Sequence, residues 1–178
     1  EAGFPAVVGG ENCDPVPLFS IIYGDRALSY GSICKFTNSL EVFEFNFIRN
    51  LLWGILPTVE GVEMKELTGE HAGEYLKILK RGVDFFKENR ELILLGRLVE
   101  IPAYNCETME LNWEIDKIKY YKKYPFVMAV KWEDHKGNTK LLLYNFKENE
   151  QKINIDSMSI NIPAKTFLSC KTEWETSI

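Results

Sequence analysis

The stretch VPLFSIIYGD, residues 16–25, decides how the rest of the sequence is interpreted. It is an almost unbroken apolar run of strand length, rich in aromatic and β-branched residues, and it stops at a Tyr-Gly-Asp turn. A run that is apolar on both faces predicts a strand covered on both sides, as parallel strands are in α/β proteins. Such folds place ligand-binding groups just after the carboxyl end of a strand. We therefore expect Asp25 to lie beside a site.

Composition and charge restrict the classes of partner. The 178 residues are 46% hydrophobic and 26% charged, with a formal net charge of -5, which is typical of a globular chain of one or two domains. This acidic balance gives no reason to expect nucleic acid or an anionic membrane surface as a partner. A basic cluster at 117–123 is interpreted as a solvated strand or loop with extended lysines. No apolar run approaches the ~20 residues of a membrane span.

The cysteines and histidines do not predict a metal site. They are scattered, without a C-x-x-C pair, and no histidine lies near a cysteine in the sequence. We interpret the cysteines as free thiols, because disulfides are scarce outside oxidising compartments. No glycine-rich phosphate loop is present either, so no cofactor is expected. The residues concerned are Cys13, Cys34, Cys106, Cys170, His71 and His135.

The first part of the chain alternates between strand and helix patterns. After a loop at 1–15, apolar residues repeat every three or four positions over 39–53, which predicts a helix with Asn38 or Ser39 as its cap and Gly54 at its end. A short strand at 55–61 follows. The clearest helix is predicted over 68–89, with Thr68 as N-cap. This order is the β/α rhythm.

From Cys106 onward, apolar residues recur at every second position instead of at the three- to four-residue spacing of a helix. Several short strands with intervening turns indicate an antiparallel sheet or sandwich, and Gly137–Asn138 marks a hairpin turn. We place a domain boundary near Ala103, between segments 1–102 and 103–178. The predicted strands cover 109–115, 125–132, 140–146, 153–155, 158–162 and 166–168.

Four carboxylates fall in loops beside predicted parallel strands, and three aromatic residues lie near them. Glycoside hydrolysis needs two carboxylates that face each other across a sugar, and aromatic rings stack on sugar faces. The pattern is therefore compatible with a sugar-processing site, although loops in general carry many carboxylates. For Trp53 a place in the core is the competing interpretation. The carboxylates are Glu1, Asp14, Asp25 and Glu60, and the aromatic residues are Tyr23, Tyr30 and Trp53.

A resemblance to a known family rests on an ordered series of short motifs. They are VPLF at 16–19 with Tyr23–Gly24, then LLWG at 51–54 with Pro57, then the helix with Tyr75, Leu76 and Arg81, closing on Pro102. This series resembles the last part of glycosidase-like TIM barrels. It is similar in particular to large bacterial glycoside-hydrolase-type proteins in which a barrel precedes a small antiparallel β-domain. The β-rich tail with NIPA at 161–164 is similar to that domain.

The resemblance implies that residues 1–102 are the last β/α units of a (β/α)8 barrel and that 103–178 form a β-sandwich. A whole barrel takes ~250 residues, so the rest of it, with most of the family's catalytic carboxylates, would lie upstream. Glu1 resembles a glutamate that the family carries at the end of a barrel strand, in a Glu-x-Gly-Phe context, which makes it the acid/base candidate. Asp25 would line the pocket.

Two hypotheses about function remain open at this point. In the first, the chain is the carboxy-terminal part of a carbohydrate-cleaving glycoside hydrolase, inactive alone, whose partner is the upstream polypeptide. In the second, it is a self-contained α+β module that binds a carbohydrate or a protein through its β-domain, without catalysis. Both hypotheses predict a site without metal or cofactor.

Overall fold

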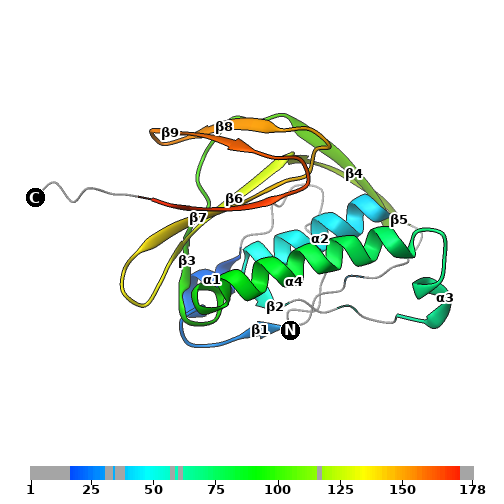
Figure 1. The fold of residues 1–178 in the computed structure, drawn as a ribbon, viewed down its shortest axis with the longest axis horizontal. Coiled ribbons are helices and arrows are strands. Elements are labelled where there is room, and N and C mark those ends of the chain that lie inside the picture. The colour runs from blue at the N-terminus through cyan, green and yellow to red at the C-terminus, as the bar shows by residue number, and fades with distance from the viewer. Residues whose placement is uncertain are drawn as a thin grey trace, which may run out of the picture.

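The computed structural model describes residues 17–30, 34, 39–56, 59, 62–115 and 118–172. Helices and short parallel strands come first in the chain, and antiparallel strands follow (Figure 1). The fold is therefore a β-rich α+β arrangement. Its elements are α1 (Leu18–Tyr23), β1 (Ser29–Tyr30), α2 (Leu40–Leu52), β2 (Ile55–Leu56), α3 (Met64–Leu67), α4 (Ala72–Leu95), β3 (Arg97–Glu100), β4 (Thr108–Ile115), β5 (Ile118–Pro125), β6 (Val127–Glu133), β7 (Thr139–Asn145), β8 (Gln151–Ile155), β9 (Met158–Ile162) and β10 (Phe167–Lys171).

A four-stranded antiparallel sheet of order β10-β7-β6-β3 lies at the centre. Its side chains alternate between two cores, as a period of two requires. On β6, Met128 and Val130 belong to the core shared with α2 and α4, whereas Val127 and Ala129 belong to the core shared with β8 and β9. Figure 1 shows the resulting layers, with the helices on one side of the sheet and the β8–β9 hairpin on the other. The antiparallel strands predicted after Cys106 are confirmed.

A second, smaller sheet is parallel. Its strands β1 and β2 pair through Ser29↔Ile55 and Tyr30↔Leu56, and α2 connects them. The predicted helix at 39–53 is confirmed, because the Ser39 side chain accepts a hydrogen bond from the Val42 amide at 3.3 Å and caps α2. Beyond its end, Gly54 adopts a φ of 76°, a left-handed conformation that favours glycine. The part of the chain from 29 to 56 is thus a β-α-β unit.

The prediction of a strand at 16–25 is wrong, because Leu18–Tyr23 forms the helix α1. The amide of Ile21 donates to the Pro17 carbonyl at 3.0 Å, which closes the first turn, and proline suits the start of a helix. The run is not covered on both sides either: Ser20 is buried, but Leu18 and Ile22 are more than half exposed. A short apolar run that does not belong to a longer periodic pattern cannot distinguish a strand from a helix.

Helix α4 packs along α2 and starts later than predicted. Thr68 does not cap it, since the Thr68 hydroxyl donates to the Met64 carbonyl at 3.0 Å and α4 begins at Ala72. The backbone is non-helical at Asn89, where the side-chain amide donates to the Phe85 carbonyl at 3.1 Å, and the helix then continues to Leu95. Although α4 has 24 residues, no helix in the described part of the chain is long and apolar enough to cross a membrane.

The central sheet takes one strand from the first segment of the chain. Strand β3, which precedes residue 103, pairs with β6 through Arg97↔Glu133 and Leu98↔Trp132. The Trp132 indole nitrogen also donates to the Leu52 carbonyl at 2.9 Å, so the sheet is hydrogen-bonded to the carboxyl end of α2. The division into domains 1–102 and 103–178 stays a prediction.

Candidate functional site

The structure describes three of the six predicted site residues. Tyr23 ends α1 and is half exposed, with its ring 5.5 Å from that of Phe19. Asp25 is exposed in the following turn, where its carboxylate lies 3.8 Å from the Arg26 guanidinium. Trp53 is buried at the end of α2. The other three, Glu1, Asp14 and Glu60, lie outside the described residues.

The helical conformation of α1 changes the position of Asp25 relative to the parallel strands. Asp25 follows a helix and precedes β1, so it lies on the amino side of the β1–β2 pair. Ligand groups in β/α folds belong to the opposite, carboxyl ends of the strands. Of the predicted site residues, Glu60 is the one that follows such an end, four positions after Leu56. The binding roles themselves stay predictions.

Asp25 lines a polar cavity of about 380 Å³ together with Arg97, Glu133, Asp134 and His135. Its other carboxylates already have local partners. Glu133 accepts from Arg97 Nη2 at 2.7 Å and from Nε at 3.0 Å. Asp134 accepts from Asn138 and from the Lys136 amide, and these hydrogen bonds lower the pKa of its carboxyl group. With its pKa lowered, the Asp134 carboxyl group is not poised to donate a proton at neutral pH.

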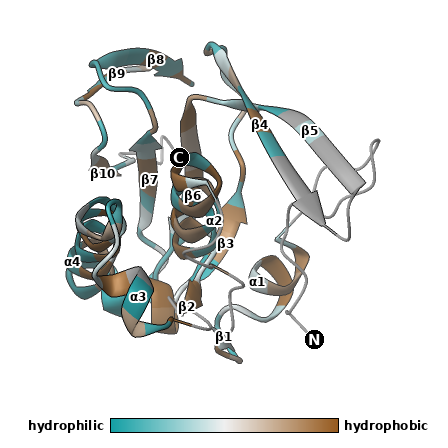
Figure 2. Cartoon of the chain, turned by 90° about the vertical axis from the view of Figure 1, so that its right-hand side faces the viewer, coloured by the Kyte–Doolittle hydropathy of each residue, from teal (hydrophilic) through white to brown (hydrophobic). Residues whose placement is uncertain are grey.

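Trp53 lines a different cavity, of about 280 Å³, which lies between α2, the end of β5 and the start of β6. Figure 2 shows the β4–β5 hairpin standing to one side of α2 and the central sheet. The described residues that line the cavity are mainly aromatic and aliphatic, and they include two cationic side chains, Arg49 and Lys123, but no acidic one. We refer to it as the Arg49–Trp53 cavity.

Arg49 is the buried cation of this cavity, with an exposed fraction of 1%. Its guanidinium carbon lies 5.0 Å from the ring centroid of Phe45 and 4.9 Å from that of Trp53, which are cation–π distances. Its Nη2 atom donates to Asn46 Oδ1 at 3.2 Å. Burial lowers the pKa of Arg49 to about 10, so the side chain stays protonated at neutral pH.

The remaining walls of the Arg49–Trp53 cavity come from the sheet and from the segment between β3 and β4. The Tyr104 hydroxyl donates to the Val127 carbonyl at 2.6 Å, and burial raises the pKa of that hydroxyl. Tyr124 and Met128 are buried. Lys123 is exposed and lies 3.3 Å from the equally exposed Glu110 carboxylate. The walls are thus held by the fold, and an exposed, ion-paired cation lies at the rim.

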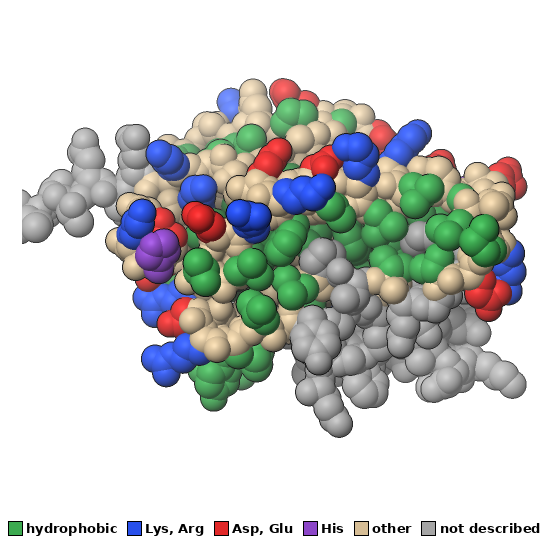
Figure 3. All heavy atoms as spheres, turned by 60° about the horizontal axis from the view of Figure 1, so that its bottom comes forward, with side chains coloured by type: hydrophobic (Ala, Val, Ile, Leu, Met, Phe, Trp, Pro, Cys, Tyr) green, Lys and Arg blue, Asp and Glu red, His purple; other side chains and the backbone are tan. Residues whose placement is uncertain are grey.

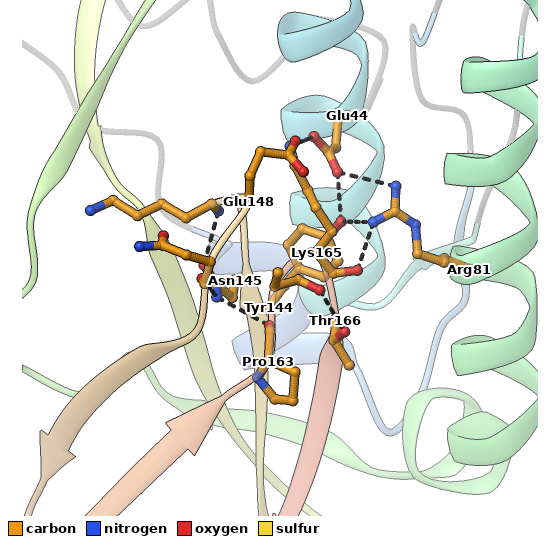
Figure 4. A network of polar contacts seen from close by, with 11 residues as sticks. Glu44, Arg81, Tyr144, Asn145, Glu148, Pro163, Lys165 and Thr166 are labelled. Carbon is orange, nitrogen blue, oxygen red and sulfur yellow. Dashed lines mark hydrogen bonds and ion pairs between the residues drawn. The ribbon is translucent and has the colours of Figure 1, made fainter.

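A network of polar side chains, separate from both cavities, joins the helices to the sheet (Figure 4). Glu44 of α2, with an exposed fraction of 4%, accepts from the Tyr144 hydroxyl and from Lys165 Nζ, each at 2.6 Å. Arg81 of α4 donates to the Tyr144 oxygen at 2.8 Å and to the Lys165 carbonyl at 2.6 Å, and lies 3.5 Å from Glu44. A carboxylate with this many partners holds elements together and is not available to a substrate.

Sequence reasoning missed Arg49, Glu44 and their partners. The available signal was the two charges, Glu44 and Arg49, set among the large apolar side chains of α2. The helix is buried from Val42 to Leu52, so both charges are buried as well. Buried charges are rare and have a structural or functional reason. Metal binding has no support from the described residues, which contain no group of three or more His, Cys, Asp or Glu side chains able to hold an ion.

Comparison with known proteins gives one relative that bears on function. The chain is 31% identical over 144 residues to a Bacteroides thetaiotaomicron protein named "Putative glycoside hydrolase". The match covers 79% of this chain but 20% of that protein, so the chain spans about a fifth of the length of its relative. No protein-family profile matches the chain, and no solved structure matches it.

Proposed function

We propose that this chain is the carboxy-terminal part of a glycoside hydrolase, which cleaves a glycosidic bond by carboxylate acid/base chemistry. The observation that carries the proposal is the match to a protein named as a glycoside hydrolase over 79% of the chain. Because that relative is about five times longer than the matched part, most of the catalytic machinery would lie in polypeptide outside these 178 residues. We propose that this polypeptide lies upstream of Glu1.

The arrangement of the first segment supports a barrel origin. Strands β1 and β2 are parallel neighbours connected by α2, and α4 follows β2, which is the order of two consecutive units of a (β/α)8 barrel. A pair of two-residue strands is too small to be a stable sheet by itself. In the proposed enzyme the upstream units would extend this sheet and complete the barrel.

Exposed apolar side chains also support the proposal that upstream polypeptide packs against this segment. Figure 3 shows hydrophobic side chains gathered on the face turned toward the viewer, beside a row of charged ones. Large exposed apolar patches mark interaction surfaces in soluble proteins. We propose that upstream polypeptide covers part of this surface. The exposed hydrophobic residues of the first segment are Leu18, Phe19, Ile22, Tyr23, Leu28, Val62, Met64, Leu67, Leu76, Val83, Leu95 and Ile101.

The proposed role of Glu1 rests on the resemblance of its Glu-x-Gly-Phe context to the family, and that of Glu60 rests on its place after β2 in the sequence. Hydrolysis requires two carboxyl groups across the scissile bond. We propose Glu1 as acid/base, and Glu60, which follows the carboxyl end of β2, as a group that contacts the sugar at the same face of the barrel. The other proposed substrate contacts have less structural support than Glu60, since Asp25 precedes β1 and Trp53 is buried. They are Asp14, Tyr23, Asp25 and Trp53.

The test is the activity of the longer protein that carries this chain, measured on a panel of aryl glycosides. Glu1→Gln should lower kcat by about 10²-fold or more, the size of a lost acid/base contribution, without a change in thermal midpoint. Glu88→Gln, an exposed change on α4, is the matched control and should leave kcat unchanged. Normal turnover in Glu1→Gln would remove Glu1 from the site, and inactivity of the unaltered protein on every glycoside would favour the second function.

That second candidate is a non-catalytic module that binds a carbohydrate or a protein. The Arg49–Trp53 cavity favours it, because an aromatic-lined hollow with few polar groups is a typical ligand site. The two candidates are distinguished by turnover, since a binding module would retain a sugar without cleaving it.

A further inference from the structure

We propose that the outer face of the β4–β5 hairpin binds a neutral polysaccharide chain, with the Tyr121 ring as the surface on which a sugar ring stacks. The choice of a sugar as ligand rests on the proposed function, but the site uses none of the residues proposed for hydrolysis. We refer to it as the Tyr121 face. It consists of Glu110 and Asn112 on β4 and of Tyr121 and Lys123 on β5.

The alternation of side chains along the two strands separates this face from the core. Leu111 of β4 and Tyr124 of β5 are buried in the core that α2 shares. The neighbouring residues Asn112 and Lys123 point to the opposite side of the hairpin and are exposed. Figure 2 shows the hairpin standing to one side of the central sheet. The Tyr121 face is therefore an open surface, over which a long chain can pass, and not a closed pocket.

Tyr121 provides the stacking surface. Its side chain is 75% exposed, so it adds little apolar burial to the fold. The C–H face of a sugar ring packs on the negative face of an aromatic ring, and a tyrosine has few rotatable bonds, so holding it against a ligand costs little conformational entropy. A single exposed ring is ordinary on a protein surface, and the ligand is indicated by the groups that surround it.

The register of the hairpin places polar groups on two sides of this ring. Tyr121 lies directly opposite Asn112, and Lys123 lies directly opposite Glu110. The Cβ atoms of opposite residues are ~5 Å apart, and neighbours on one face of a strand are ~7 Å apart. The side-chain amide of Asn112 offers both a donor and an acceptor, which is what sugar hydroxyls require. The stacking ring and its hydrogen-bonding groups are thus within reach of one ligand.

The charges of the face favour a neutral sugar over an acidic or a basic one. Lys123 Nζ lies 3.3 Å from the Glu110 carboxylate, so these two charges offset each other. The pair further along the register, Glu114↔Lys119, also joins residues of opposite charge. A surface without net charge concentrates neither anions nor cations. Exposed ion pairs are weak in water, so Glu110 and Lys123 can exchange each other for sugar hydroxyls at little cost.

The experiment is affinity electrophoresis of the 178-residue chain through native gels that each contain one soluble polysaccharide. The neutral polymers are hydroxyethylcellulose, galactomannan and soluble starch, and polygalacturonate is the anionic comparison. We expect retardation in at least one neutral gel and none in the polygalacturonate gel. Added salt should leave the retardation unchanged, because screening weakens only interactions between charges.

Variants with matched controls locate the site. Tyr121→Ser should raise the Kd obtained from the retardation about tenfold, whereas Tyr121→Phe keeps the ring and should retain binding. Phe19→Ser, which removes a half-exposed ring from α1, should not alter the retardation. Asn112→Ala should weaken binding several-fold, and Asn154→Ala, an exposed change on β8, is its control. None of these surface changes should shift the thermal midpoint.

Each opposite result overturns the proposal. Retardation that survives Tyr121→Ser would place the polymer elsewhere, and its loss in Tyr121→Phe would mean that the hydroxyl binds and not the ring. Retardation by polygalacturonate alone would assign the binding to the lysines of the hairpin, and no retardation in any gel would mean that the face is not a sugar site. The gels measure binding and not turnover, and in the longer protein Tyr121→Ser should leave kcat on aryl glycosides unchanged. Failure of this site is therefore distinguishable from failure of the proposed hydrolase activity.

Discussion

The Nζ atom of Lys165 lies 2.6 Å from the Oε2 atom of Glu44, although 121 residues separate the two in the sequence. Around this contact, Tyr144 and Arg81 complete a network in which one buried carboxylate joins α2, α4, β7 and the turn before β10 (Figure 4). Backbone geometry adds to its specificity, since Lys165 has a φ of 49°, which a non-glycine residue rarely adopts.

Glu44→Ala should be among the most destabilising single changes in the chain. It leaves the Tyr144 hydroxyl, Lys165 and Arg81 without their shared acceptor, and breaking such a network costs about 2–4 kcal/mol after allowance for the partial exposure of the two cations. Urea unfolding measures this directly. Glu88→Ala, an exposed change on α4, should stay within about 0.5 kcal/mol. Equal effects of the two substitutions would contradict a structural role for the network.

Tyr144 should make the stability of the protein sensitive to alkaline pH. Burial, and then the nearby Glu44 carboxylate, raise the pKa of the Tyr144 hydroxyl above its ordinary value of 10.0. A raised pKa in the folded state means that the stabilisation is complete below pH 10 and is lost as the pH rises above it, because the unfolded phenol ionises first. The unfolding free energy should therefore fall in wild type relative to Tyr144→Phe between pH 10 and 11, by at most about 1.4 kcal/mol per pH unit. Parallel curves for the two proteins would refute this.

Two glycines of α4 should respond to alanine with opposite signs. A Cβ atom at Gly82 would lie 2.2 Å from Phe47 Cε1 and 2.7 Å from Leu51 Cδ1, so α2 and α4 would have to separate. Overpacking of this kind costs about 1–3 kcal/mol, more than the helix propensity that alanine adds. A Cβ atom at Gly73 would meet nothing within 4 Å, and Gly73→Ala should stabilise by up to about 1 kcal/mol. Thermal unfolding of the pair checks both signs, and a neutral Gly82→Ala would mean that the helices are loosely packed.

Ile22→Ser should distinguish a barrel segment from a self-contained module. Ile22 is 51% exposed in α1, so the change should alter the stability of this chain by no more than about 0.5 kcal/mol. If upstream polypeptide covers α1, the same change in the longer protein should cost about 1–3 kcal/mol. Tyr121→Ser, at 75% exposed on β5, is the control and should be neutral in both. A neutral Ile22→Ser in the longer protein would remove α1 from the proposed interface.

Much of the fold could be predicted because local patterns determine it. The Ser39 cap and the apolar repeat place α2, and alternation places β6 and β7 around the turn at Gly137, which has a φ of 84°. The conformation of residues 16–25 was predicted wrongly because a six-residue helix has fewer than two turns in which a helical pattern could show. Whether such a short apolar run becomes a helix or a strand depends on the surface against which it packs, which here is β3. Strand β3 lies more than seventy residues further along the sequence, so local pattern contains no information about it.

The candidate site could be predicted only in part, for a different reason. The Arg49–Trp53 cavity is formed by α2, Tyr104, the end of β5 and the start of β6. Helix α2 is far from the other segments in the sequence, and they come together only in the folded chain. Trp53 was among the predicted substrate contacts, and the structure places it in a hollow that is distinct from the cavity lined by Asp25. Spacing along the sequence contains no information about which of these hollows exists.

The long sequence separation of Glu44 and Lys165 has a consequence for folding kinetics. The β-α-β unit and α4 consist of contacts between neighbours in the chain, which form quickly, whereas the pair 121 residues apart closes a long loop and is expected to form last. Interactions absent from the transition state set the rate of unfolding and barely affect the rate of folding. The Glu44 network would then slow unfolding, and so determine the lifetime of the folded chain, with little effect on the folding rate.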